Sequence, residues 1–153
     1  MYRAIIAATL AGFALSGCAT QPSVAPQDFA WSYADNPSEG AKLAYGRPQS
    51  DEVLLMMTCA PGEGITLSAA AIGGAKLMLA SGDAKTSLNG EVTEGFDGVG
   101  FVEATTSSRG PALTEFRRSG DLTMTSGARR FQMSAFDGDR PAVRRFFNAC
   151  DAA

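Results

Sequence analysis

The chain has 153 residues, of which 45% are hydrophobic and 19% charged, and its formal net charge is −3 at pH 7. This composition is typical of a folded protein, and the length suits a single domain. The chain contains no histidine, which excludes Ser-His and Cys-His catalysis and removes the commonest ligand of zinc, copper and iron. We therefore expect no metal centre and no cofactor, and the acidic balance argues against a nucleic-acid partner.

The first residues have the layout of a secretory signal. A single basic residue, Arg3, precedes an apolar run over residues 4–15, and small residues follow. The run is shorter than the roughly 20 apolar residues that a membrane-spanning helix needs. We therefore expect a signal peptide over residues 1–17. A plain secretory signal that is cut after Ala19 is the alternative, because Gly17 and Ala19 also fit a small-x-small cleavage site.

The signal ends in the sequence Leu15-Ser16-Gly17-Cys18, which resembles the lipobox of bacterial lipoproteins. This resemblance implies that the leader is removed and that the Cys18 thiol carries a fatty-acyl chain such as palmitate. Ala19, and not aspartate, follows the cysteine, which in such lipoproteins favours the outer membrane over the inner one. We expect a cell-envelope protein held by its lipid on the periplasmic face of the outer membrane. The body of the chain resembles no named family.

Three cysteines are present, and acylation of Cys18 leaves Cys59 and Cys150 as a pair. The compartment beyond the inner membrane is oxidising, so this pair is expected to form a disulfide. Two buried, unpaired thiols are the alternative. Residues 18–28 have the composition of a flexible tether, and residues 29–153 are expected to form one β-rich domain.

The first predicted strand begins at Phe29, where Phe29, Trp31 and Tyr33 alternate with small residues. These rings either cover the core or offer a stacking surface, which makes Trp31 a possible ligand-binding residue. Alternation, apolar runs and turn residues predict the remaining strands, which lie at 42–45, 53–57, 65–71, 76–80, 99–105, 122–125 and 131–135.

Three of these strands have further expected features. The continuous apolar run at 53–57 predicts a central strand buried on both faces. Together with 65–71 and 76–80, it is expected to form an antiparallel meander, with Gly73-Gly74 as a hairpin turn. Residues 90–98 predict an acidic hairpin, with a cation site made of acidic side chains as the alternative; these are Glu91, Glu94 and Asp97.

Two helices are expected. One lies near 112–118, with a proline at its start and a glycine after its end, and the other lies near 140–150. In the second, Val143, Phe146, Phe147 and Cys150 fall on one face, so this face would bring Cys150 to Cys59. The predicted fold is mainly β, a single antiparallel sandwich or small barrel of about seven to nine short strands with these two helices.

Basic residues are unevenly distributed. Residues 19–108 contain four Lys or Arg against eleven acids, whereas residues 109–153 contain eight arginines against five acids. Arginine recognises carboxylate and phosphate through paired hydrogen bonds. Four arginines are therefore possible ligand-binding residues, and the alternative is that they only offset the acidic part; they are Arg117, Arg118, Arg144 and Arg145.

No catalytic signature accompanies these features. We expect a non-enzymatic cell-envelope lipoprotein, a small binding or assembly module whose partners are membrane lipid and an envelope protein or peptidoglycan. Its expected architecture is similar to that of the small disulfide-bonded β-barrel lipoproteins that inhibit lysozyme, and inhibition is one alternative. The other alternative is a glycan hydrolase that uses two carboxylates as acid and base, drawn from Asp51, Glu52, Glu63, Glu91, Glu94 and Asp97.

Overall fold

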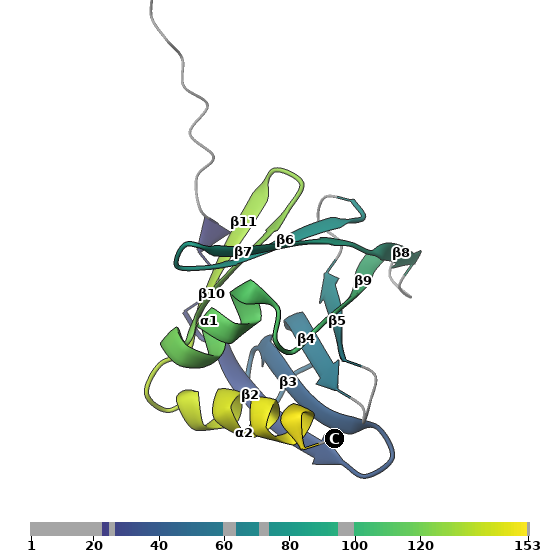
Figure 1. Ribbon diagram of the computed structural model, residues 1–153. Coiled ribbons are helices and arrows are strands. Elements are labelled where there is room, and N and C mark those ends of the chain that lie inside the picture. Colours follow the sequence, from purple (N-terminus) through teal and green to yellow (C-terminus); the bar gives the residue numbers. More distant parts are fainter. Residues whose placement is uncertain (1–22, 25–26, 60–63, 71–73, 95–99, 153) are drawn as a thin grey trace, which may run out of the picture.

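The computed structural model describes residues 23–24, 27–59, 64–70, 74–94 and 100–152 (Figure 1). Within these residues, eleven strands form one six-stranded and one five-stranded sheet, and two helices pack against them. The mainly β fold is confirmed. The described strands stay in two separate sheets and do not close into a barrel, so the structure agrees with the sandwich form of the prediction.

The six-stranded sheet has the order β2-β3-β4-β5-β9-β8, and all its neighbours are antiparallel. Its strands are β2 (Ala30–Asn36), β3 (Gly40–Gly46), β4 (Val53–Cys59), β5 (Ile65–Ala70), β8 (Glu91–Glu94) and β9 (Gly100–Thr106). The expectation that β4 is buried on both faces is wrong. Leu55 and Met57 are fully buried, whereas Leu54 and Met56 are half-buried, because no described element covers the outer face of this strand.

The five-stranded sheet has the order β1-β11-β10-β6-β7. β1 runs parallel to β11, and the other neighbours are antiparallel. Its strands are β1 (Ser23–Val24), β6 (Lys76–Ser81), β7 (Ala84–Asn89), β10 (Asp121–Ser126) and β11 (Arg129–Ser134).

The connections differ from the prediction in three places. The expected meander ends after β5, which pairs with β9, while β6 lies in the other sheet between β10 and β7. Residues 84–89, for which the sequence predicts no strand, form β7, and the expected tether contributes β1. β8 lies within the predicted acidic hairpin of residues 90–98, of which residues 95–98 lie outside the described residues. Alternation along one strand shows which side chains face the core but does not name the strand beside it, so the pairing was not recoverable from the pattern.

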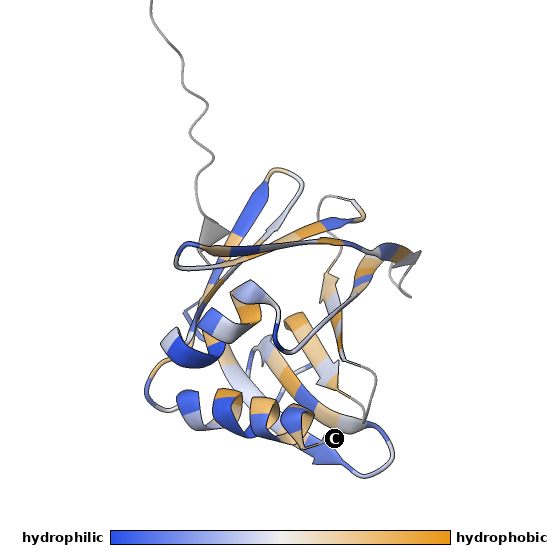
Figure 2. Cartoon of the chain, in the orientation of Figure 1, coloured by the Kyte–Doolittle hydropathy of each residue, from blue (hydrophilic) through white to orange (hydrophobic). Residues whose placement is uncertain are grey.

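Helices α1 (Pro111–Ser119) and α2 (Arg140–Asp151) lie where the sequence predicts them. α1 packs on β6 and β7, and α2 packs on β2 and β3. Each helix buries one apolar face, and both carry alternating hydrophilic and hydrophobic stretches in Figure 2. Gly120 ends α1 in the left-handed conformation, with φ of 80°, which glycine adopts without steric cost. Among the described residues, neither helix is long and apolar enough to cross a membrane.

An aromatic cluster joins the two sheets through the helices. The ring centroid of Phe116 on α1 lies 4.9 Å from that of Trp31 on β2 and 6.1 Å from that of Phe147 on α2. Trp31 also lies 5.0 Å from Tyr45 and is only 3% exposed. The Trp31 ring is therefore part of the core and does not form the exposed stacking surface considered as an alternative.

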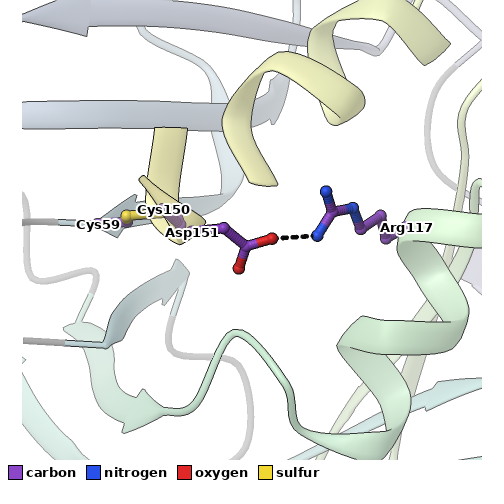
Figure 3. Close-up of a disulfide and its surroundings, with 4 residues drawn as sticks. All are labelled: Cys59, Arg117, Cys150 and Asp151. Carbon is purple, nitrogen blue, oxygen red and sulfur yellow. Dashed lines mark hydrogen bonds and ion pairs between the residues drawn. A yellow bond between two sulfur atoms is a disulfide. The ribbon is translucent and has the colours of Figure 1, made fainter. Parts of the chain in front are cut away.

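The predicted disulfide between Cys59 and Cys150 is confirmed. Their Cα atoms lie 5.6 Å apart, and the bond links the end of β4 to the last turn of α2. Figure 3 shows it beside Asp151, whose carboxylate points toward Arg117 of α1. The apolar face of α2 is thus joined covalently to the sheet that it covers.

Removing this disulfide is expected to lower stability strongly. The sequence separation of 91 residues corresponds to about 4 to 5 kcal/mol of the free energy of unfolding in the chain-entropy account. Denaturant unfolding of a Cys59→Ser/Cys150→Ser variant measures this loss. The wild-type protein under reducing conditions is the control and should unfold at the same denaturant midpoint as the variant. If both unfolded at the midpoint of the oxidised wild-type protein, the prediction would be contradicted.

Candidate functional site

A small pocket lies between the end of α1 and the first turns of α2. Its volume is about 100 Å³, and we call it the arginine pocket; its lining residues are Arg117, Arg118, Gly120, Arg140, Val143 and Arg144. Three of the four arginines singled out in the sequence meet here although they come from two helices. Arg145 does not line the pocket.

The two arginines from α1 are held by polar partners. The Arg117 guanidinium donates to the Asp151 carboxylate at 2.5 Å and to the side-chain oxygen of Asn148 at 2.8 Å, and it lies 5.7 Å from the ring centroid of Phe147. Arg118 donates two hydrogen bonds to Glu115, one turn earlier in α1. The hydrogen bonds to Glu115 raise the pKa of Arg118.

Arg140 is the pocket residue that the sequence analysis missed. Its guanidinium donates to the backbone carbonyl of Ser119, at the end of α1, and it lies against Gly120, where an added Cβ would be 3.2 Å from the guanidinium carbon. Arg140 therefore caps a helix carbonyl that has no partner within its own helix. The sequence feature that could have identified Arg140 is its spacing of four residues from Arg144, because this spacing places both side chains on one face of α2.

Arg144 gives the pocket its chemical capacity. It is exposed, and within the described part of the chain it forms no ion pair or side-chain hydrogen bond. The pocket contains four guanidinium groups, and the carboxylates paired with them are those of Glu115 and Asp151, which leaves an excess of two positive charges. Such an arrangement suits an oxyanion bound by paired N–H donors.

The size of the pocket limits what it can enclose. Pockets that bind drug-sized ligands usually have volumes of about 300 to 1,000 Å³, several times the volume of about 100 Å³ found here. The pocket can therefore enclose a group no larger than about a single carboxylate or phosphate. The pocket is therefore suited to one charged group of a larger molecule whose other parts lie on the surface.

Arg145, the fourth predicted arginine, lies on a different face of α2. It is exposed, and its charge acts on Tyr33 of β2. The pKa of Tyr33 is raised by burial first and by Asp35 second, and Arg145 opposes both. Arg145 thus has the same chemistry as Arg144 at the next position of the helix but lies outside the arginine pocket.

Of the carboxylates considered for a hydrolase, those that lie within the described residues do not come together in one site. Asp51 and Glu91 are exposed, and Glu52 forms an ion pair with Arg47 at 3.1 Å. Glu63, Asp97 and the side chain of Glu94 lie outside the described residues, and so does most of the cation site considered with Glu91. No three metal-ligating side chains come together in the described ranges.

A larger groove adjoins the disulfide. Its volume is about 420 Å³, and it is lined by residues 35–41 of the β2–β3 hairpin together with Cys59, Ala149 and Ala152. Glu39 in this groove is already paired with Lys42 at 2.6 Å, and this hydrogen bond lowers the pKa of Glu39. The groove therefore offers mainly turn backbone and small side chains, and the arginine pocket is the better candidate site.

Comparison of the chain with models of protein families, with characterised proteins and with solved structures finds no match.

The two arginines of α2 that line the pocket should differ in their effect on folding. Arg140→Ala removes a charged hydrogen bond to a half-buried helix carbonyl and is expected to cost about 1.5 to 3 kcal/mol of unfolding free energy. Arg144→Ala, one turn later and without such a bond, should change it by less than about 0.5 kcal/mol. Chemical denaturation of both variants makes the comparison, and equal stabilities would rule out the capping role of Arg140.

Proposed function

We propose that the protein is a non-enzymatic cell-envelope lipoprotein, held in a membrane by an acylated Cys18 and binding an anionic group of an envelope component in its arginine pocket. The anchor is supported by the lipobox-like sequence Leu15-Ser16-Gly17-Cys18. The disulfide supports it further, since Cys59 and Cys150 account for the other two cysteines. The thiol in the acylation position is thus not needed by the fold.

The binding role depends on one observation, the convergence of four arginines from two helices on a pocket of about 100 Å³. Asp151 and Glu115 pair with two of these guanidinium groups. The remaining two positive charges repel each other and favour an anionic partner. Carboxylates of peptidoglycan stem peptides and phosphates of lipopolysaccharide supply such groups in the envelope. Both are planar or tetrahedral oxyanions that a guanidinium binds with two hydrogen bonds.

The anchor is tested by the fate of Cys18 in cells. Cys18→Ala should abolish incorporation of labelled fatty acid and release the protein into the soluble fraction at high salt, because it removes the atom that carries the lipid. Ala19→Asp is the control, because it leaves the thiol in place and should keep the label. Labelling and membrane retention that persist in Cys18→Ala would refute the anchor.

Anion binding is tested with neighbouring arginines of α2. Arg144→Gln should weaken binding of inorganic phosphate or acetate by about tenfold or more, as expected for the loss of a charged hydrogen bond, whereas Arg145→Gln should leave it unchanged. Both variants remove one positive charge from the same helix, so a general charge effect cancels. Calorimetric titration of the full chain in neutral detergent measures the two dissociation constants. Equal weakening in both variants, or no binding to the wild-type protein, would overturn the pocket's role.

A further inference from the structure

The outer face of the five-stranded sheet carries basic residues on a chain that is acidic overall. Lys76 and Lys85 point outward from β6 and β7, and Arg130 does so from β11, because the residues that alternate with them face the core. All three are exposed, and none forms an ion pair within the described part of the chain. We call this surface the basic face; the only acidic residue pointing outward from its described strands is Asp121.

Strand register places these residues on one continuous surface. Ser87, Met78, Thr125 and Arg130 lie side by side across β7, β6, β10 and β11. Met78 is 36% exposed and is one of four large hydrophobic residues exposed among the described residues. A depression of about 350 Å³, lined in part by Lys76, Met78 and Thr125, lies on this face. The basic face therefore combines cations, hydroxyl groups and one exposed apolar side chain.

The proposed lipid anchor joins the fold at this same sheet. β1 lies at its edge beside β11, and Ser23 pairs with Phe131, the neighbour of Arg130. The chain thus reaches the sheet next to the Arg130 end of the basic face. Cys18 precedes Ser23 by five residues, which span at most about 18 Å when fully extended. A lipid on Cys18 would hold this sheet close to the membrane surface.

The two helices lie on the opposite side of the sheet. α1 packs against the inner side of β6 and β7, and in Figure 1 the five-stranded sheet lies at the upper end of the molecule, with α2 and the carboxyl terminus toward the lower end. A sheet that approached the membrane with its outer face would direct α2 away from it. The arginine pocket would then remain accessible.

We propose that the basic face docks on the anionic phospholipid headgroups of the membrane that holds Cys18, and so fixes the orientation of the domain. This inference rests on the proposed lipid anchor. Basic residues within a Debye length of an anionic bilayer are attracted to it, and an acyl chain plus a basic patch is a common pair of membrane-binding signals. The tether keeps the β1 edge of the sheet within about 18 Å of Cys18, and docking of the basic face would bring Lys76, Lys85 and Arg130 within a Debye length of the headgroups.

The two lysines themselves report the orientation. The full lipidated chain is placed on neutral phosphatidylcholine vesicles and on vesicles containing phosphatidylglycerol, and a membrane-impermeant amine reagent is added. Each basic residue beside an anionic surface contributes about a fivefold preference, so Lys76 and Lys85 should react at least about fivefold more slowly on the anionic vesicles. Lys42 on the six-stranded sheet is the internal control and should react equally on both. Peptide mass spectrometry measures the three rates.

A matched pair of variants tests whether the protection of the lysines depends on the charge of the basic face or only on the charge of the whole protein. Arg130→Gln should reduce the protection of both lysines on anionic vesicles, whereas Arg145→Gln, which removes the same charge from α2, should not. Equal reaction rates on the two vesicle types, whether fast or slow, would overturn the docking of the basic face. Failure of the wild-type protein to float with neutral vesicles would instead overturn the lipid anchor, and this inference with it.

Discussion

The contact of Phe116 with Trp31 and Phe147 is the interaction on which the rest of the structure depends. Phe116 belongs to the helix that covers the five-stranded sheet, whereas Trp31 and Phe147 belong to the six-stranded sheet and its helix. Aromatic pairs of this kind contribute about 0.5 to 1.5 kcal/mol beyond the burial of their surface. Phe116 therefore helps to join the two sheets in one core, together with the contacts of β6 and β7 with β9.

The arginine pocket is a consequence of that helix arrangement. α2 is fixed near its first turn by the bond from Arg140 to the end of α1, and at its last turn by the disulfide and by the ion pair between Asp151 and Arg117. Guanidinium groups that are held in place before a ligand arrives lose less conformational entropy when they bind it. The guanidinium groups of Arg117 and Arg140 are thus preorganised by contacts that also stabilise the fold.

Charge is organised by surface and not by overall balance. The net charge of −3 would by itself suggest repulsion from an anionic membrane, yet cations without an ion pair among the described residues gather in the arginine pocket and on the basic face. Screening limits the reach of exposed charges to roughly 8 Å at physiological salt, so a local cluster acts on a nearby surface even when the whole chain is acidic. The arginine pocket lies between the two helices, whereas the basic face lies on the outer side of a sheet, so the two regions are suited to different partners.

The sequence by itself determined the features that follow from local chemistry. The two helices were predictable from proline, glycine and the apolar face that contains Phe146 and Phe147, and the disulfide followed from the count of cysteines. Most strands were predictable because alternation marks the residues that face the core. The lipobox at Cys18 is likewise a local signal, and the anchor that it implies stays a prediction.

Only the tertiary structure decided which elements are neighbours. It placed β6 in the five-stranded sheet, added β7 in a polar segment with weak alternation, and joined Arg140 to the arginines of α1. The pairing of strands distant in sequence depends on the packing of the whole core, which no local pattern encodes. For the same reason Trp31, whose spacing fitted an exposed platform as well as a core strand, could be assigned to the core only after α1 was seen to cover it.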